Sequence, residues 1–348
     1  MSRSLCRGDF ILCPQDTGKN MRKILVTGAY GQIGSELVPA LCDRFGADRV
    51  IASDIKMAHI GVRDQESRHE QIDCTQLSQI QEIVRRYDVG TIYHLAALLS
   101  ARAEDTPQLA WAVNMGGLRN VLEVARQFDV AVFFPSSIGA FGPGTPRDAT
   151  PQVTVQRPST IYGVTKVSGE LLCDYYAQRF GVDTRGLRLP GLISFTAPPG
   201  GGTTDYAVDI FYGAIRYRHY TCFLEHDTRL DMMYMPDAIA AMIKLMEADP
   251  ARLNHRNAYN VAAMSFAPEN LAVEIARHVP DFAMDYQVDP LRQAIADSWP
   301  RSMDDSAARG DWDWAPHYTI EAMTSDMLVR LGSRLIGRAD GGANRHAP

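Results

Sequence analysis

The first half of the chain alternates between short apolar runs and longer segments in which apolar residues recur every three or four positions. Apolar runs bounded by polar residues predict strands that are buried on both faces, as in a parallel sheet. The recurring pattern predicts amphipathic helices that cover such a sheet. The predicted strands are residues 23–27, 49–54, a short strand ending at 71–74, 91–97, 130–134 and 184–189. Predicted helices begin near residues 37, 77, 114 and 162, so strand and helix alternate as in a doubly wound α/β fold.

A glycine-rich turn joins the first predicted strand to the first predicted helix. It reads Gly28-Ala29-Tyr30-Gly31-Gln32-Ile33-Gly34, with a glycine at every third position. These glycines permit a tight turn, close approach of the backbone to a pyrophosphate and close packing of helix against strand. Asp54 ends the second predicted strand, where a carboxylate accepts the ribose hydroxyls of an adenosine and repels a 2′-phosphate. The spacing predicts a Rossmann fold that binds NAD rather than NADP.

Two polar residues near the next strands have more than one interpretation. Asp73 contacts the adenine amino group or caps the helix that begins near residue 77, and both roles can hold together. His94 lies in the fourth predicted strand without a second ligand at metal spacing. We therefore interpret His94 as a hydrogen-bonded structural residue and expect no metal site.

The same patterns divide the chain. Residues 21–190 form the predicted NAD-binding domain, and residues 191–331 form a smaller C-terminal substrate-binding lobe. The lobe is discontinuous, because residues 257–261 have the pattern of a strand that returns to the main sheet. Residues 332–348 lack apolar periodicity and are predicted to form a disordered tail. The extension over residues 1–20 carries arginines and serines but also two aspartates, so a mitochondrial transit peptide and a disordered extension of a cytoplasmic protein both stay open.

Composition narrows the possible partners. The chain has 348 residues, of which 46% are hydrophobic and 22% are charged, with a net charge of -6 and no basic stripe. Nucleic acid is therefore not an expected partner. No apolar run is long enough to span a membrane. The six cysteines are scattered without zinc-type pairs, which is typical of reduced thiols.

Tyr162 and Lys166 are the candidate chemical groups around which the other residues are arranged. Residues four apart on a helix lie on one face, so the lysine ammonium and the phenol are expected to be neighbours. A positive charge near a phenol lowers its pKa, and a phenol tuned in this way can take a proton from an alcohol. A solvated lysine beside a half-buried tyrosine is the simpler interpretation of this pair when it occurs alone.

Hydroxyl side chains follow two of the predicted strands. Ser136 and Ser137 end the fifth strand, where they bind a substrate oxygen or form a turn. Ser100 follows the fourth strand. Substrates bind at the carboxyl ends of the strands in open sheets of this kind, so all three serines are candidate substrate ligands.

Taken in order, these motifs make the chain resemble the extended short-chain dehydrogenases/reductases over residues 21–331. The resemblance implies that Tyr162 is the acid/base, that Lys166 holds the nicotinamide ribose and lowers the pKa of the phenol, and that Ser137 orients the substrate. It also implies that Asn114 braces Lys166 through water. The implied NAD-binding residues are Gly28, Tyr30, Gly31, Gln32, Ile33, Gly34, Asp54, Asp73, Cys74, Leu95, Ala96, Ala97, Tyr162, Lys166 and Leu192.

Segments of the second half resemble the short-chain type of L-threonine 3-dehydrogenase. These are Gly201-Gly202-Thr203-Thr204-Asp205-Tyr206 and Asp297-Ser298-Trp299-Pro300. The resemblance implies oxidation of the L-threonine β-hydroxyl to 2-amino-3-oxobutanoate. Thr203 and Thr204 offer donors to a carboxylate and Trp299 excludes water, although a surface loop and a core aromatic are the simpler interpretations. The loop over residues 198–204 is a candidate lid.

Two other functions and one assembly stay open. A sugar-nucleotide epimerase or dehydratase has the same fold and retains its NAD, and Arg229 and Arg292 are candidates for binding a nucleoside diphosphate. A non-catalytic NAD sensor is the third possibility, although it has no need of Tyr162 and Lys166. The helices that begin near residues 114 and 162 carry surplus apolar residues, which favour a homodimer or a fuller core.

Overall fold

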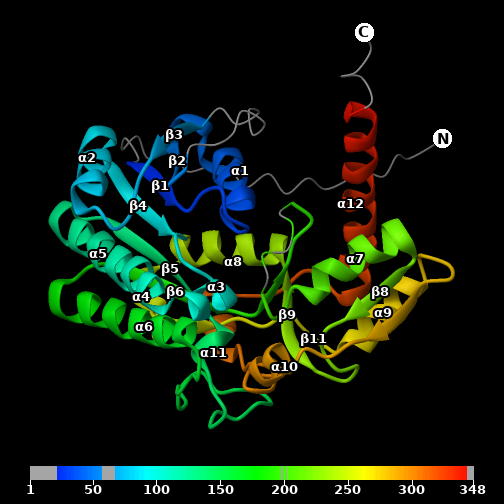
Figure 1. Ribbon diagram of the computed structural model, residues 1–348. Helices are drawn as coiled ribbons and strands as arrows, with labels where there is room; N and C mark the ends of the chain where they lie inside the picture. Colours follow the sequence, from blue (N-terminus) through cyan, green and yellow to red (C-terminus); the bar gives the residue numbers. More distant parts are fainter. Residues whose placement is uncertain (1–21, 57–66, 197, 199, 201, 343–348) are drawn as a thin grey trace, which may run out of the picture.

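A sheet of seven parallel strands forms the centre of the N-terminal half (Figure 1). The computed structural model describes residues 22–56, 67–196, 198, 200 and 202–342. The strands lie in the order β10-β6-β5-β4-β1-β2-β3. Their bounds are β1 (Lys23–Thr27), β2 (Val50–Asp54), β3 (Arg68–Gln71), β4 (Val89–His94), β5 (Ala131–Ser137), β6 (Thr184–Leu189) and β10 (Tyr259–Asn260). The order turns back between β1 and β4, and such a switch point is where doubly wound sheets bind ligands.

Helices cover both faces of this sheet, which confirms the predicted Rossmann class. Leu25 of β1 packs in the core beneath α2, α5 and α6, whereas Val26 packs beneath α1 and α8, because successive strand side chains point to opposite faces. The bounds are α1 (Gly34–Phe45), η1 (Ala47–Arg49), α2 (Leu77–Tyr87), α3 (Ser100–Asp105), α4 (Pro107–Trp111), η2 (Ala112–Gly116), α5 (Gly117–Phe128), η3 (Ile138–Ala140), α6 (Ile161–Phe180), α8 (Met235–Glu247) and α11 (Ser306–Trp312).

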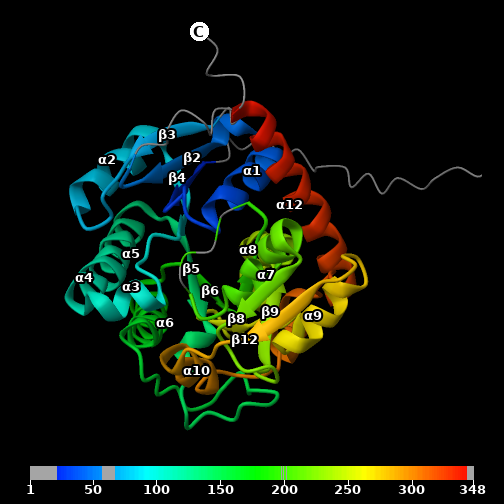
Figure 2. The same cartoon turned by 45° about the vertical axis from the view of Figure 1, so that its right-hand side comes forward.

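The C-terminal lobe has a core of its own around two small sheets (Figure 2). In the three-stranded sheet β9 lies between a parallel neighbour, β7, and an antiparallel one, β11; strands β8 and β12 form the second sheet. The bounds are β7 (Gly191–Ile193), α7 (Tyr206–Tyr217), β8 (His219–Cys222), β9 (Leu230–Tyr234), η4 (Pro250–Arg252), β11 (Met264–Phe266), α9 (Pro268–Ala276), β12 (Ala283–Tyr286), α10 (Pro290–Asp297) and α12 (Ile320–Gly342). Within the described residues, no helix is long and apolar enough to cross a membrane.

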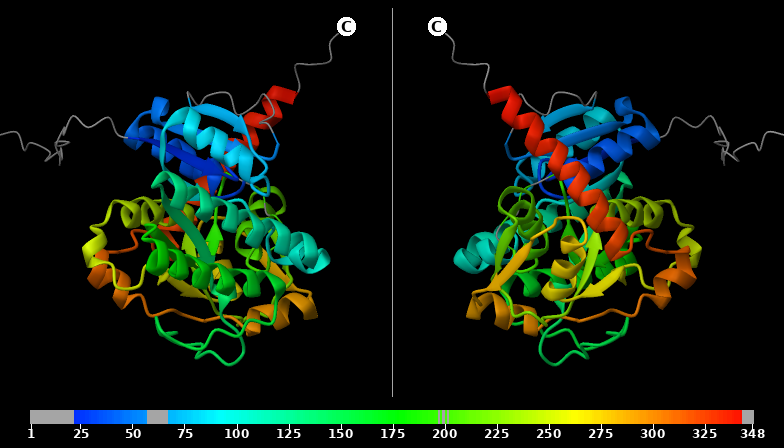
Figure 3. Two further views of the ribbon diagram at one scale, coloured as in Figure 1. Left: turned by 90° about the vertical axis from the view of Figure 1, so that its left-hand side faces the viewer. Right: turned by 90° about the vertical axis from the view of Figure 1, so that its right-hand side faces the viewer.

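The prediction of a disordered tail is wrong for residues 332–342, which continue helix α12. Met323, Met327 and Leu331 lie one turn apart and are fully buried in the lobe core, so the helix is held by packing. Arg334 extends this attachment, because its guanidinium donates to the carbonyl oxygen of Phe195 at 2.7 Å. Figure 3 shows α12 in red, running from the lobe past α1. Residues 343–348 and the extension over residues 1–20 lie outside the described residues.

Three predicted element boundaries also differ from the structure. The strand predicted over residues 91–97 ends at His94, whereas β5 extends as far as Ser137. Asn114 does not begin a helix; it lies in the π-helical turn η2 between α4 and α5. The spacing of apolar residues does not reveal a π turn, because such a turn inserts one extra residue into an otherwise continuous helical pattern.

Candidate active site

A cavity of about 530 Å³ opens where strands β1, β4, β5 and β6 end, beside the C-terminal lobe. Most of the residues predicted from the sequence line it together, although they come from both halves of the chain. The predicted lining residues are Gly28, Tyr30, Gly31, Gln32, Ile33, Gly34, Leu95, Ala97, Ser100, Ser136, Ser137, Tyr162, Lys166, Leu192, Thr203, Thr204 and Trp299. Lining residues that the sequence did not assign to the site include Ile138, Leu189, Pro190 and Gly191, whose signal was their place at or just after the ends of β5 and β6.

The glycine turn has the geometry that a dinucleotide requires. Gly28 has a φ of 71°, and a Cβ added there would lie 2.7 Å from the backbone nitrogen of Ala96. A Cβ on Gly34 would lie 2.5 Å from the Gly28 carbonyl oxygen, so α1 can begin this close to the turn only with glycine. The N-terminus of α1 therefore forms part of the cavity wall, where its partial positive charge attracts phosphates. Asp54 lies beside the turn and accepts the Tyr30 backbone N–H at 3.2 Å, so these residues fit NAD.

Four of the predicted NAD-binding residues are not among the described lining residues of this cavity: Asp54, Asp73, Cys74 and Ala96, of which Ala96 lines a smaller cavity instead. The Asp73 carboxylate accepts the backbone N–H and the hydroxyl of Thr75, at 2.9 and 2.7 Å. The prediction that Asp73 caps α2 is therefore wrong, because the residue before that helix is Gln76 and Asp73 stabilises the preceding turn. Cys74 is buried and packs close to Gly117.

Helix α6 positions the candidate acid/base and its lysine. The helix is capped by Thr160, whose hydroxyl accepts the Gly163 backbone N–H at 3.1 Å. Lys166 is buried, and its Nζ lies 5.3 Å from the centre of the Tyr162 ring. The same Nζ donates to the Pro135 carbonyl oxygen at 2.6 Å, so Lys166 is held between helix α6 and the end of β5.

The pKa of the phenol differs from the prediction. Burial raises the pKa of Tyr162 to about 12, and a hydrogen bond with the Ser137 hydroxyl opposes that rise. Burial also lowers the pKa of Lys166 to about 8, although the Glu170 carboxylate acts in the opposite direction. The prediction that Lys166 lowers the phenol pKa below its ordinary value is therefore wrong for the protein by itself, because desolvation of the phenolate outweighs the effect of the neighbouring groups.

The two serines at the end of β5 have different partners. The Ser137 hydroxyl bonds with the Tyr162 phenol and accepts the Gly139 backbone N–H at 3.1 Å. Ser136 is buried, and its hydroxyl donates to the Glu170 carboxylate. The role of holding a substrate oxygen stays a prediction for Ser137, whereas the Ser136 hydroxyl is engaged by Glu170.

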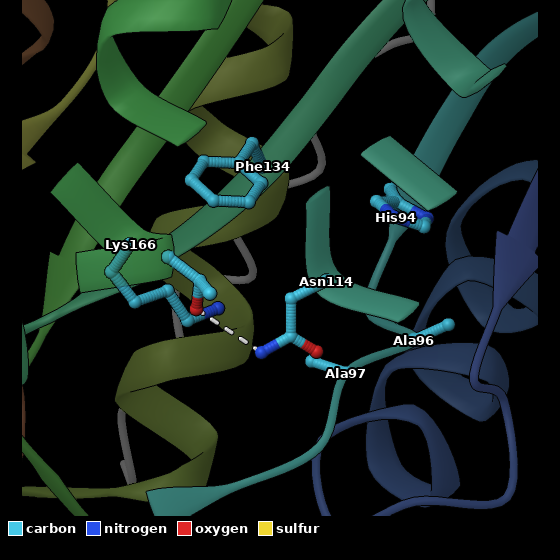
Figure 4. A pocket seen from close by; sticks show the side chains of 7 residues that line it. His94, Ala96, Ala97, Asn114, Phe134 and Lys166 are labelled. Carbon is cyan, nitrogen blue, oxygen red and sulfur yellow. Dashed lines mark hydrogen bonds between the residues drawn. The ribbon is translucent and has the colours of Figure 1, made fainter. Parts of the chain in front are cut away.

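Asn114 lies behind Lys166 in a second, much smaller cavity (Figure 4). Its side-chain oxygen accepts the Leu98 backbone N–H at 2.8 Å, and its amide nitrogen donates to the Thr165 hydroxyl at 3.1 Å. The cavity measures about 10 Å³, which is roughly the space that one water molecule needs. His94 also lines it, and its Nδ1 lies 2.8 Å from the Thr27 hydroxyl, which confirms the structural interpretation of His94.

The lobe side of the large cavity is built from Thr203, Thr204 and Trp299. Thr203 and Trp299 are buried, and the Trp299 carbonyl accepts a hydrogen bond from Arg147 Nε at 3.2 Å. Position 202 is fixed by a bond from its backbone N–H to the Asp205 carboxylate at 2.7 Å. Residues 199 and 201 of the predicted lid lie outside the described residues, so the lid stays a prediction.

The two arginines expected to bind a nucleoside diphosphate lie elsewhere. Arg229 donates to the Ser265 carbonyl oxygen at 2.7 Å. The Arg292 guanidinium stacks over the Phe223 ring, 4.3 Å from its centre. Neither arginine is among the described residues that line the large cavity. Of the residues in the described part of the chain, no three acidic, histidine or cysteine side chains are grouped to hold a metal ion.

Comparisons with known proteins agree with this architecture. The model of the NAD dependent epimerase/dehydratase family matches residues 24–262. A Staphylococcus aureus protein named "Uncharacterized epimerase/dehydratase" is 54% identical over 89% of this chain and 97% of its own length. The structure of L-threonine dehydrogenase from Clostridium difficile is 52% identical and has a TM-score of 0.88, covering 91% of this chain and 99% of that one. The holo form of a GalE-like L-threonine dehydrogenase from Cupriavidus necator is 51% identical with a TM-score of 0.86, over 89% and 99% of the two chains.

The residues matched by the family model include the glycine turn, Asn114, Tyr162 and Lys166. The fold, the dinucleotide-binding turn and the family match thus point to one assignment. The chain belongs to the NAD dependent epimerase/dehydratase family, also described as the extended short-chain dehydrogenases/reductases.

Proposed function

We propose that the protein is an NAD-dependent L-threonine 3-dehydrogenase, which oxidises the β-hydroxyl of L-threonine to 2-amino-3-oxobutanoate. One observation carries this proposal: Tyr162, Ser137 and Lys166 line the same cavity as Thr203, Thr204 and Trp299 of the lobe. Solved relatives that are about half identical over nine-tenths of this chain are named as L-threonine dehydrogenases.

The residues of the cavity divide the reaction between them. Tyr162 takes the proton of the substrate hydroxyl, and Ser137 holds the same oxygen beside the phenol. Bound NAD supplies the acceptor for the hydride that leaves the β-carbon. Lys166 stabilises the phenolate through its charge. The Asn114 side chain donates to the hydroxyl of Thr165, the residue before Lys166, and so supports the helix at that point. Proton and hydride leave the substrate together as the carbonyl forms, so no metal ion is needed for the chemistry.

The lobe residues account for selection of a small amino acid. Thr203 and Thr204 are two hydroxyl residues that line the same cavity as the phenol, and hydroxyl donors suit a substrate carboxylate. Trp299 closes the same side with an apolar surface. Water excluded in this way cannot compete for the hydrogen bonds that orient the substrate.

The direct test is formation of NADH by the purified full-length protein with L-threonine, L-serine, L-allo-threonine and a panel of nucleotide sugars. We expect turnover with L-threonine and none with the nucleotide sugars. Turnover of a nucleotide sugar without net NADH, together with silence on threonine, would instead support the epimerase alternative. Binding of NAD without turnover of any substrate would support the sensor alternative.

We also propose that the protein is a homodimer formed through α4 and α6. The helix predicted near residue 114 is replaced by α4 in this proposal, because Leu118, Val121 and Leu122 of α5 are buried. Leu109 and Trp111 of α4 are half exposed, and so are Leu171 and Tyr175 of α6, at 64% and 53%. Exposed large apolar residues grouped on adjacent helices are typical of subunit interfaces. Light scattering after size exclusion should give twice the chain mass of 38.5 kDa for the wild type and a single chain for Leu171→Glu. A monomeric wild type would contradict the proposal.

Mitochondrial import is a further proposal, supported only by the arginines and serines of residues 1–20. Fusion of these residues to a fluorescent protein tests it directly. Mitochondrial fluorescence that is lost when Arg3 and Arg7 are changed to glutamate would support import. Diffuse fluorescence of the unchanged fusion would contradict it.

A further inference from the structure

Residues 135–137 at the end of β5 are bonded one by one to helix α6. The three bonds join the Pro135 carbonyl to Lys166 Nζ, the Ser136 hydroxyl to the Glu170 carboxylate, and the Ser137 hydroxyl to the Tyr162 phenol. Their helix partners are successively four residues apart, so they lie along one face of α6. The proposed acid/base and its lysine thus belong to a row of three side chains, of which Glu170 is the third.

Glu170 is the carboxylate of this row, and it is buried, with 2% of its surface exposed. It pairs with Arg188 of β6, whose Nη2 lies 2.8 Å from its Oε2. Its Oε2 also accepts the Gln156 amide at 3.0 Å, and its Oε1 accepts the Ser136 hydroxyl. A buried ion pair with this many satisfied hydrogen bonds holds its members in one arrangement.

Arg188 fixes the position of the carboxylate from the other side. Its Nη1 donates to the Gln152 carbonyl oxygen at 2.8 Å and to the Asn260 side-chain oxygen at 3.1 Å. These partners belong to the loop before α6 and to strand β10. Glu170 is therefore anchored to the sheet independently of Ser136, so it can act as a fixed acceptor for that hydroxyl.

We propose that Glu170 is a positioning residue for the dehydrogenase reaction, acting through Ser136 to hold the end of β5 so that Ser137 meets the Tyr162 phenol. Glu170 touches neither substrate nor cofactor in this role. A serine hydroxyl displaced by even a fraction of its hydrogen-bond length orients a substrate oxygen poorly. This inference rests on the proposed function, since it concerns the geometry of that same site.

Glu170 also contributes charge to the surroundings of Lys166. The titratable groups that face Lys166 are Glu170 and Cys173 of its own helix, Tyr162, and His94 from β4. Burial raises the pKa of Cys173 and lowers that of His94 to about 3, so both are uncharged at neutral pH. The Glu170 carboxylate is therefore the group among these four that favours the charged form of Lys166.

Three full-length variants test the proposal. Ser136→Ala removes the link to Glu170 but leaves the Glu170–Arg188 pair intact. Glu170→Gln keeps an acceptor for Ser136 and removes the charge. The matched control is Thr184→Val, which removes another buried hydroxyl bond between the sheet and α6, from Thr184 Oγ1 to the Cys173 carbonyl at 3.0 Å.

Each variant is compared with wild type by threonine kinetics over pH, by thermal unfolding and by hydrogen exchange over residues 133–141. For Ser136→Ala we expect kcat to fall about tenfold with KM for NAD unchanged, and exchange over that segment to become faster. For Thr184→Val we expect a similar loss of stability with kcat within about twofold of wild type. For Glu170→Gln, the pH at which the rate stops rising should move lower, because Lys166 loses its proton more easily.

A Ser136→Ala enzyme with the kcat and the hydrogen-exchange rates of wild type would overturn the proposal. A Thr184→Val enzyme whose kcat falls as much as that of Ser136→Ala would overturn it too. The exchange measurement needs no substrate. If the wild type does not oxidise threonine but exchange still accelerates in Ser136→Ala alone, the proposed function fails and the positioning role of Glu170 stands. If Glu170→Gln does not fold, Ser136→Ala and its control still decide the question.

Discussion

Two groups of residues line the large cavity, and these two walls are assembled in different ways. The catalytic wall is made of Ser137, Tyr162 and Lys166. It comes from the end of strand β5 and from α6, the next long helix, and hydrogen bonds join successive residues of β5 to that helix. The substrate wall, Thr203, Thr204 and Trp299, comes from two segments separated by most of the C-terminal lobe.

The supports of the substrate wall are correspondingly remote in sequence. Arg147 holds Trp299 by its carbonyl oxygen, and the Arg147 carbonyl in turn accepts the Arg301 backbone N–H at 2.7 Å. Arg334 of α12 holds the Phe195 carbonyl at the start of the segment that leads to Thr203. A wall built in this way can change its substrate without altering the acid/base, which is how one fold in this family can host different reactions.

The largest effect should come from the catalytic wall. Tyr162→Phe removes the group that takes the hydroxyl proton while keeping the ring, so we expect kcat for threonine to fall about 10²- to 10⁴-fold. Binding of NADH, measured by fluorescence titration, should change little. Tyr217→Phe, at an exposed tyrosine that ends α7, is the control. Unchanged turnover in Tyr162→Phe would exclude the catalytic role of this wall.

The pH dependence tests the electrostatics of the same wall. The pKa of Tyr162 is raised to about 12, so the phenolate fraction and the rate should rise about tenfold per pH unit in the neutral range. Lys166, with its pKa lowered to about 8, loses its charge above that pH and should flatten the profile there. The measurement is kcat/KM for threonine across pH. A rate that is already constant between neutrality and pH 8 would show that bound NAD lowers the phenol pKa far more than this protein environment raises it.

A smaller and different effect is expected from the substrate wall. Trp299→Leu opens the apolar side of the cavity and should raise KM for threonine about tenfold, with a smaller change in kcat and none in KM for NAD. Steady-state kinetics in which threonine and NAD are each varied separates kcat from the two KM values. A fall in kcat alone would mean that Trp299 acts on the chemical step, and the contrast between the two walls would be lost.

The smallest effect concerns stability of the lobe. Burial raises the pKa of Asp231 in β9 to about 8 from its ordinary value of 3.8, and its carboxylate accepts the Met303 backbone N–H at 2.8 Å. The folded state thus favours the protonated form. The stability that protonated Asp231 contributes is full below the pKa of this group in the unfolded chain. It is lost as the pH rises to the pKa of the group in the folded protein.

Asp231→Asn keeps an acceptor and cannot ionise, so at pH 8 it should increase the free energy of unfolding by at least about 1 kcal/mol relative to wild type. The gain should vanish at acidic pH. Urea unfolding at several pH values measures it, with the exposed Asp285→Asn as control. Equal stability of the Asp231 variant and wild type at all pH values would contradict the assignment.

The spacing of residues along the sequence was sufficient to predict those features that depend on residues close together in the chain. The order of strands and helices, the glycine turn and the pairing of Tyr162 with Lys166 all follow from periods of two, three or four residues, because backbone geometry translates such periods directly into faces and turns. Four features depended on contacts between distant segments. These are the continuation of α12 past residue 331, the π turn at Asn114, the bond of Ser136 to Glu170 and the raised pKa of Tyr162. Burial and hydrogen-bond partners are properties of the packed chain, and no short window of sequence contains them.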